Sequence, residues 1–144
     1  MNIDFLLQNN FKKIGELSIN QPINHRKRKH GVYYTGEAPS TKGVYSLTHG
    51  TEIVKFGDTN AAEGMKSRIN NYLSNTEATN VFIRENVKTD KGYDVYFFEI
   101  IPEMVEVMEI KVEKSIVPRS LEKALIEKFV SFHGKKPKLN KTMK

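Results

Sequence analysis

The spacing of apolar and polar residues divides the first half of the chain into short segments of different type. Residues 4–14 place apolar side chains at helical spacing, whereas residues 15–39 are rich in polar, basic and turn-forming residues. We expect a short helix followed by an extended basic arm. The runs 43–47 and 52–57 are β-prone and flank a Thr-His-Gly-Thr segment that suits a tight reversal, which predicts a β-hairpin.

Two helices are predicted after this hairpin. Asn60 stands three residues before Glu63, the spacing of a capping box, and residues 65–73 continue with apolar side chains at helical spacing. Nearer the C-terminus, residues 121–129 carry an apolar stripe of Leu and Phe side chains, and Gly134 is the expected end of that helix.

Three further runs of β-prone residues occupy positions 80–84, 94–101 and 104–112. The letters VYFFEII within the second run are too apolar for a strand with one fully solvated face. At least one of these runs is therefore expected to be a central strand of a sheet.

Length and composition narrow the class of protein. A chain of 144 residues has room for one core, so binding and catalysis must share a single domain. Lys and Arg outnumber Asp and Glu by 23 to 17, and the net charge of +6 favours a polyanionic partner such as nucleic acid. The chain has no cysteine, which excludes disulfides and thiolate zinc sites. We expect a cytoplasmic protein with neither a signal peptide nor a membrane-spanning segment.

Four residues on these predicted elements have the chemistry to hydrolyse a phosphodiester. Tyr45 is the candidate base, because a phenolate accepts a proton from water once its usual pKa of about 10 is lowered. Lys55, on the other arm of the hairpin, is the cation expected to lower it. Arg68 presents a planar guanidinium to phosphate oxygens, and Glu122 offers an oxygen ligand to Mg²⁺ or Mn²⁺. Each residue alone equally fits an ordinary strand or surface position, so their order and spacing carry the hypothesis.

That order resembles the GIY-YIG nuclease superfamily. The motifs that carry the resemblance lie between residues 42 and 141 and are GVY at 43–45, KFG at 55–57, Arg68 and Tyr72 in RINNY, Glu122 in LEKALIEKF, and Asn140 in PKLN.

The resemblance implies a fold as well as an activity. The fold is α+β, with a small central antiparallel three-stranded sheet flanked by helices, in one domain of residues 1–144. Residues 1–41 form its N-terminal helix and basic arm, and residues 42–141 form the catalytic core. The activity is cleavage of double-stranded DNA to a 5′-phosphate and a 3′-hydroxyl, with Glu122 as the metal ligand. Tyr72 and Asn140 join the catalytic set by the same resemblance.

Two features set this chain apart from the usual pattern of the superfamily. Lys55 stands in place of the YIG tyrosine, and the segment between KFG and Arg68 is longer than usual. Lys55 and the stretch LIEKFVSFHGKKP make the chain most similar to the compact type II restriction endonucleases of the superfamily.

Basic residues in two segments are candidates for contacts with DNA. The run HRKRKH at 25–30 fits either phosphate contacts from an arm or a solvated charge run. The four histidines lack the spacing of a metal-binding pair, and His133 fits a structural or solvated position. The candidates for DNA binding are His25, Arg26, Lys27, Arg28, Lys29, Lys135 and Lys136.

Three functions stay open at this stage. The first is a sequence-specific, type II restriction-like endonuclease, the second a catalytically silent DNA-binding module of the same fold, and the third a nuclease of a phage or mobile element. A double-strand break needs two active sites, which predicts a homodimer acting on a palindromic target. Recognition sequence and cleavage stagger depend on side-chain placement and DNA deformation, which a sequence does not specify.

Overall fold

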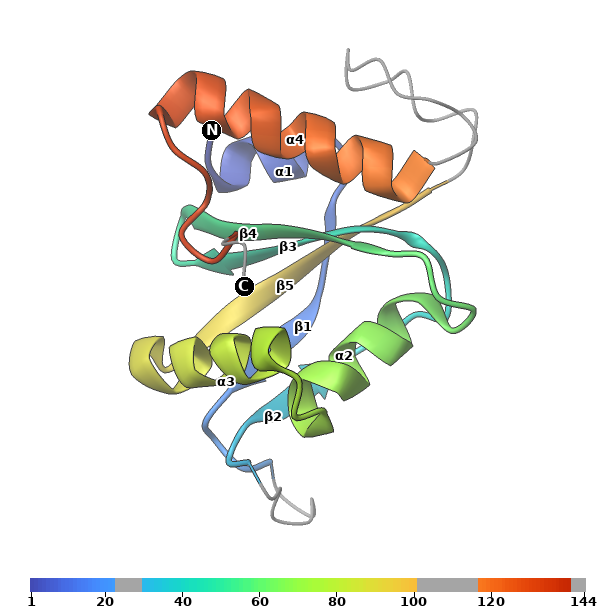
Figure 1. Cartoon of the computed structure of the whole chain (residues 1–144), viewed down its shortest axis with the longest axis vertical. Coiled ribbons are helices and arrows are strands. Elements are labelled where there is room, and N and C mark those ends of the chain that lie inside the picture. The colour runs from blue at the N-terminus through green and yellow to red at the C-terminus, as the bar shows by residue number, and fades with distance from the viewer. Residues whose placement is uncertain (23–29, 101–116, 141–144) are drawn as a thin grey trace.

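The computed structural model describes residues 1–22, 30–100 and 117–140. These residues form a five-stranded antiparallel sheet in the order β2-β1-β5-β3-β4, with helices on both faces (Figure 1). The predicted α+β class is confirmed. The elements are α1 (Ile3–Gln8), β1 (Lys12–Ser18), β2 (Tyr33–Gly36), β3 (Gly43–His49), β4 (Glu52–Thr59), α2 (Gly64–Ser74), α3 (Ala78–Asp90), β5 (Gly92–Glu99) and α4 (Val117–His133).

The prediction of three strands is wrong, because the N-terminal segment adds β1 and β2 to the sheet. The helix expected over residues 4–14 ends at Gln8, and Asn10 adopts a left-handed φ of 65° just before β1. Strand β1 pairs with both β5 and β2, so the expected arm is partly a pair of strands. Leu6 from α1 and Phe11 from the segment just before β1 pack in the same hydrophobic core, so their spacing in the sequence resembles that of a single helix.

The predicted hairpin is confirmed as β3 and β4. Tyr45 lies opposite Gly57 and Leu47 lies opposite Lys55, and the register then shifts by one residue at a bulge after Leu47. Strand β3 also pairs with β5, so β3 is interior and β4 forms the edge of the sheet. The apolar run at 94–101 is confirmed as the central strand β5.

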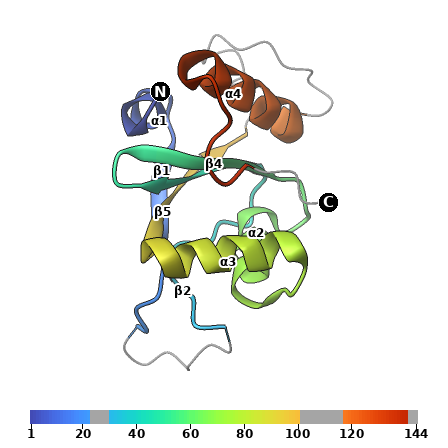
Figure 2. The same ribbon diagram turned by 60° about the vertical axis from the view of Figure 1, so that its left-hand side comes forward.

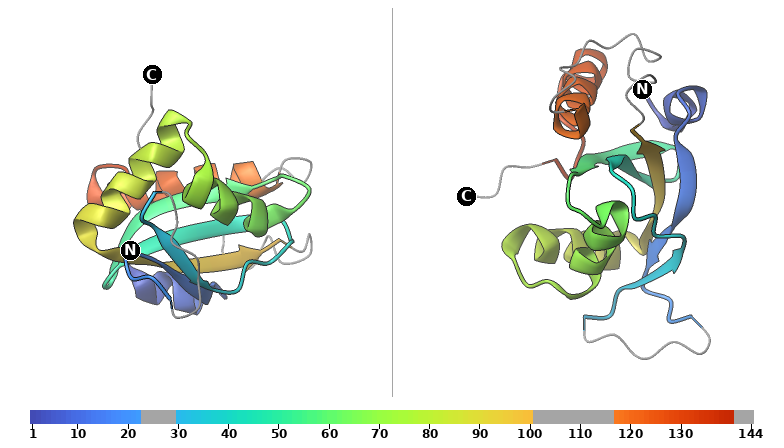
Figure 3. Two further views of the ribbon diagram at one scale, coloured as in Figure 1. Left: turned by 90° about the horizontal axis from the view of Figure 1, so that it is seen from below. Right: turned by 90° about the vertical axis from the view of Figure 1, so that its right-hand side faces the viewer.

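The sheet separates two hydrophobic cores, which explains the continuous apolar runs in β3 and β5. Figure 2 and the right-hand view in Figure 3 show α1 and α4 on one side of the β3–β4 hairpin, with α2 and α3 on the other side. Side chains alternate between the two cores: Val44 and Phe98 belong to the core with α1 and α4, whereas Tyr45 and Phe97 belong to the core with α2 and α3.

Two predicted helices are confirmed as α2 and α4. Gly134 ends α4 as expected, with a φ of 74° and its N–H donating to the carbonyl of Val130 at 2.8 Å. The expected capping box is wrong, because Glu63 occupies the N-cap of α2 and its side chain makes no capping hydrogen bond. Among the described residues, no helix has both the length and the apolar character needed to cross a bilayer.

The β-prone run at 80–84 is wrong as a strand, since it lies within α3. Asn80, Ile83, Arg84 and Val87 are the buried residues of α3 and recur at the spacing of one helical face. Arg84 donates to the carbonyl of Tyr72 at 2.9 Å and so joins α3 to α2. Tertiary packing therefore overrides the local strand propensity. The run predicted at 104–112 lies outside the described residues.

One polar network attaches the segment after α4 to the end of α3, and it predicts how stability depends on pH. The Asp90 carboxylate accepts hydrogen bonds from Lys138, at 2.8 Å, and from the hydroxyl of Tyr93. These bonds lower the pKa of Asp90 below its usual value, and the bond from Lys138 has the larger effect. A lowered folded-state pKa contributes stability above the unfolded pKa of about 3.9, and the contribution is lost as the pH falls through the folded value.

We therefore expect Asp90→Asn to be less stable than the wild type at pH 7, with a smaller deficit at about pH 2, which is below the unfolded pKa of about 3.9. Thermal unfolding at both pH values measures this difference. Lys88→Gln, which removes an exposed lysine paired with Glu85 on the same helix, serves as the control and should change stability little. An Asp90→Asn deficit of the same size at both pH values contradicts the assignment.

Candidate active site

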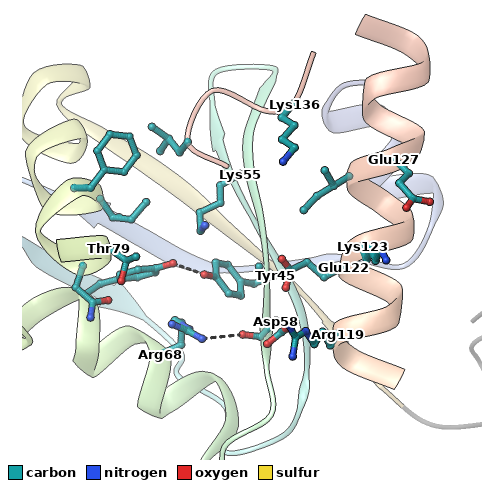
Figure 4. Close-up of a pocket in the computed structure, with 17 residues that line it drawn as sticks. Tyr45, Lys55, Asp58, Arg68, Thr79, Arg119, Glu122, Lys123, Glu127 and Lys136 are labelled. Carbon is teal, nitrogen blue, oxygen red and sulfur yellow. Dashed lines mark hydrogen bonds between the residues drawn. The ribbon is translucent and has the colours of Figure 1, made fainter. Parts of the chain in front are cut away.

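A pocket of about 620 Å³ opens at the edge strand β4, between α4 on one side and α2 and α3 on the other (Figure 4). Because β4 is the last strand in the sheet, part of its outer edge is free to border a pocket instead of another strand. The pocket brings together five of the six residues predicted to be catalytic, namely Tyr45, Lys55, Arg68, Tyr72 and Glu122.

The hydroxyl groups of Tyr45 and Tyr72 are hydrogen-bonded to each other in this pocket. Tyr45 comes from β3 and Tyr72 from α2, and their rings meet edge to face with centroids 6.2 Å apart. Burial raises the pKa of Tyr45 well above its usual value, the neighbouring Tyr72 adds to this, and Arg68 opposes it. Burial likewise raises the pKa of Tyr72 to about 12. Both tyrosines therefore keep their protons at neutral pH.

Gly57 makes this position of Tyr45 possible. The two residues lie opposite each other in the hairpin, and the Tyr45 ring lies directly over the backbone of Gly57. A Cβ atom at position 57 would overlap two carbons of that ring and its hydroxyl oxygen. The ring therefore reaches the edge of the sheet only because its partner residue has no side chain.

Lys55 lies on the same face of the hairpin as Tyr45, as the sequence predicts, two residue pairs further along. Figure 4 shows its side chain extending into the pocket. Burial lowers the pKa of Lys55 itself. The expected lowering of the Tyr45 pKa is wrong, because desolvation of a fully buried phenol outweighs the neighbouring cations. The cation that opposes this shift is Arg68, which takes the electrostatic role assigned to Lys55 from the sequence.

Arg68 reaches the pocket from α2, one helical turn before Tyr72. Its Nη2 atom donates to the backbone carbonyl of Asp58 at 3.3 Å, which holds the guanidinium beside β4. The pKa of Arg68 is raised, chiefly by its proximity to Tyr45, so the group is always charged. A guanidinium has five N–H donors in a planar fork, so it can bond this carbonyl and an anion together.

Asp58 is a residue of the site that the sequence interpretation missed. It lies opposite Val44, on the face of the hairpin that α4 covers, and Glu122 extends from α4 toward it (Figure 4). Burial raises the pKa of Glu122 to about 8, and a hydrogen bond and charge repulsion from Asp58 add to this. The two carboxyl groups are thus close enough to share a proton. Strand alternation could have shown that Asp58 and Gly57 face opposite sides, but not which helix covers each side.

The paired carboxyl groups fit a hard divalent cation. Mg²⁺ and Mn²⁺ prefer oxygen ligands, and a cation between Asp58 and Glu122 would replace the shared proton and relieve their repulsion. Among the described residues, no three His, Cys, Asp or Glu side chains gather into a metal site. Such an ion would therefore have two protein ligands, with water and a substrate phosphate completing its coordination.

Asn140, the sixth predicted residue, contacts the backbone of β4 instead of the pocket. Its side-chain amide accepts from the N–H of Phe56 at 2.8 Å and donates to the carbonyl of the same residue at 2.7 Å. The N–H of Leu139 donates to the carbonyl of Val54 at 2.8 Å. This segment therefore covers part of the β4 edge and leaves the edge next to Asp58 open to the pocket.

Of the basic residues predicted to bind DNA, the structure describes Lys135 and Lys136. Lys136 lines the pocket of Figure 4, and both Lys135 and Lys136 line a second pocket beside the end of α4. His133 contacts the Met1 carbonyl at 2.9 Å, which agrees with a structural role. Arg119 and Lys123 add two cations to the active-site pocket that the sequence did not single out. The predicted residues His25, Arg26, Lys27, Arg28 and Lys29 lie outside the described residues.

Of the comparisons with known proteins, the comparison with solved structures gives a match, and this match concerns the fold. No family model matches the sequence, and no curated protein matches it significantly. Among solved structures, the chain is similar to restriction endonuclease HPY188I in complex with product DNA, with a TM-score of 0.51. The identity is 18%, and the match covers 98% of this chain and 86% of that chain. The chain thus shares the fold of a restriction endonuclease.

The close contact between Gly57 and Tyr45 predicts an energetic coupling between them. We expect Gly57→Ala to lower the free energy of unfolding by about 1–3 kcal/mol, because the added methyl group must displace the ring. In a Tyr45→Ala background the same change should cost much less. Chemical denaturation of the single and double variants measures this coupling.

Gly50→Ala is the control for backbone strain. It lies in the hairpin turn at a φ of 61° with open space around it, so its cost should be the same with and without the Tyr45 ring. Equal costs for Gly57→Ala in the two backgrounds would show that the ring is not what Gly57 accommodates.

Proposed function

We propose that this protein is a divalent-metal-dependent endonuclease that hydrolyses phosphodiester bonds of double-stranded DNA. The observation that carries the proposal is the pocket at β4, where a tyrosine pair, Arg68 and the Asp58–Glu122 pair face one another. The shared fold with a restriction endonuclease supports it. Membership of the GIY-YIG superfamily, with a type II restriction-like activity, is part of the proposal and rests on the sequence motifs.

The scissile phosphate would lie between Arg68 and the carboxyl pair. Arg68 and Lys55 bind its oxygens and neutralise the charge that develops in the transition state. Asp58 and Glu122 would hold an Mg²⁺ or Mn²⁺ ion, which would supply Lewis-acid stabilisation of the phosphate. In this arrangement cations and acids enclose a pocket of nucleotide size.

Tyr45 is the proposed base for the attacking water. Once Tyr45 has released its proton to solvent, the water oxygen forms a bond to phosphorus and its proton passes to the Tyr45 oxygen. The bond from phosphorus to the 3′-oxygen breaks, and this oxygen takes a proton from a solvent water to leave as a hydroxyl. Tyr45 must first lose its own proton, and the Glu122 charge is one of the influences that hold this proton in place. Because burial raises the pKa of Glu122 to about 8, this carboxyl is mostly neutral at pH 7, and with Arg68 in place the Tyr45 phenolate is more accessible than it would be beside a charged Glu122.

The proposed partner is duplex DNA, held by a basic surface that includes Lys136 beside the pocket. One pocket in each chain cuts one strand, so we propose a homodimer on a palindromic target. Restriction and a phage or mobile-element role use the same chemistry. The high pKa of Tyr45 favours one second candidate, a DNA-binding module of the same fold that does not cleave.

Incubation of supercoiled plasmid with the purified protein and Mg²⁺ tests the proposal. Discrete bands are the expected result, and a smear would indicate cleavage without sequence specificity. Glu122→Gln, which keeps the size of the side chain and removes the charge, is the control that separates the protein's own activity from a contaminating nuclease. Intact plasmid that nevertheless shifts in a gel would favour the silent module.

The carboxyl pair makes a separate prediction about metal binding. We expect Asp58→Asn and Glu122→Gln each to weaken binding of Mn²⁺ by roughly tenfold or more, because each removes one of two anionic ligands. Paramagnetic resonance of free Mn²⁺ measures binding without any need for cleavage. Glu127→Gln, on the same helix and lining the same pocket, is the matched control and should bind Mn²⁺ as the wild type does. Unchanged binding by Asp58→Asn would leave Glu122 as the sole carboxylate ligand.

A further inference from the structure

The pocket extends beyond the groups that the hydrolysis uses. At the α3 end its wall consists of Phe82 and Ile83 from α3 and Leu139 from the segment after α4, all of them apolar. Thr79 and Asn80, in the first turn of α3, add the polar groups of this end. Nothing in the cleavage of a phosphate requires this second, largely apolar half of the pocket.

Asn80 has an unusual environment for a buried amide. The residue is 4% exposed, and its Oδ1 atom is buried without a hydrogen-bond partner. Asn80 lies one helical turn before Arg84, whose side chain donates to the carbonyl of Tyr72, so both residues lie on the face of α3 that is turned toward α2. Asn80 and the tyrosine pair line the same pocket.

A buried amide without a partner destabilises a fold, so its retention in a pocket indicates a ligand. The side chain of Asn combines an acceptor, Oδ1, with the donor Nδ2. A phosphate has only acceptors and would leave Oδ1 unpaired. The edge of a nucleobase with an exocyclic amino group has a donor beside an acceptor, as in the pairing of Asn with adenine. The apolar side chains of Phe82, Ile83 and Leu139, which line the same pocket, suit the faces of such a base better than they suit a water molecule.

We propose that the α3 end of the pocket is a subsite for an unpaired nucleobase that carries an exocyclic amino group, with Asn80 as its hydrogen-bonding partner. The inference rests on the proposed function, since it places the base beside the scissile phosphate bound by Arg68. The base leaves the stack of the duplex to enter the subsite, as bases do in enzymes that extrude a nucleotide. Asn80 thereby gives the site a preference for the sequence at the cut.

Binding of mononucleotides tests the subsite without a known target sequence. Calorimetric titration compares 2′-deoxyadenosine 5′-monophosphate with the analogue in which the amino group is replaced by hydrogen. The same comparison is made for 2′-deoxycytidine 5′-monophosphate, with Ca²⁺ present throughout. We expect the wild type to bind each amino-bearing nucleotide about tenfold more tightly than its analogue. Equal affinities within both pairs overturn the proposal.

Asn80→Leu, a substitution of similar volume, should abolish that difference. It should not lower the melting temperature, because it removes a buried polar group that has no partner. Thr48→Val is the matched control: Thr48 is also buried with an unpartnered oxygen, but it lies outside this pocket. A lower melting temperature for Asn80→Leu with the difference intact would make Asn80 a structural residue and overturn the proposal.

Deoxyribose 5-phosphate separates failure of the subsite from failure of the proposed function. Its binding depends on the phosphate site alone, so it should weaken in Arg68→Ala and stay unchanged in Asn80→Leu. Phosphate binding through Arg68 with no preference for an amino group would overturn the subsite and leave the nuclease proposal in place. No binding of any phosphate to the wild type would overturn both.

Discussion

The Tyr45 ring lies over the backbone of Gly57, and the arrangement of the pocket depends on this contact. Tyr45 belongs to an interior strand, so its hydroxyl would otherwise be enclosed by the sheet and its helices. Because Gly57 has no side chain, the ring extends toward the edge strand, where it meets Tyr72 from α2. The same edge carries Asp58 on its other face, toward α4. The pairing of Tyr45 with Gly57 thus brings the tyrosine pair of one core to the strand that carries Asp58 on the side of the other core.

Burial sets the protonation of these groups before any ligand binds. Desolvation is the largest influence on the pKa values of Tyr45, Tyr72 and Glu122, and in each case it favours the neutral form. It acts on Lys55 in the same sense, by lowering its pKa. Arg68, in contrast, is fixed in its charged form. A pocket in this state gains the most from a ligand that brings both signs of charge, such as a phosphate accompanied by a divalent cation.

Two asparagine side chains near the pocket differ in their hydrogen bonding. Asn140 pairs both polar atoms with the backbone of Phe56 and so fixes the segment that carries Leu139 and Lys136 to β4. Asn80 is more deeply buried than Asn140, but the structure gives its Oδ1 no partner. The first amide stabilises the wall of the pocket, whereas the second lowers stability at the position where a ligand would be bound.

The sequence alone determined the elements nearest the chemistry. The hairpin of β3 and β4, the helices α2 and α4, and the meeting of Tyr45, Lys55, Arg68, Tyr72 and Glu122 all follow from local periodicity and motif order. These features depend on neighbours within a few residues, or on spacings that a family of similar chains makes recognisable.

Only the tertiary structure decided the rest. The pairing of β1 with β5, the helical state of residues 80–84 and the approach of Asp58 to Glu122 join segments far apart in the chain. Local propensity does not contain such contacts, since it is the packing partner that determines which face of a strand or helix is buried. The high pKa of Tyr45 was missed for the same reason. The motifs in the sequence showed which cations lie near Tyr45. They did not show the desolvation of its ring, because desolvation depends on the whole fold around it.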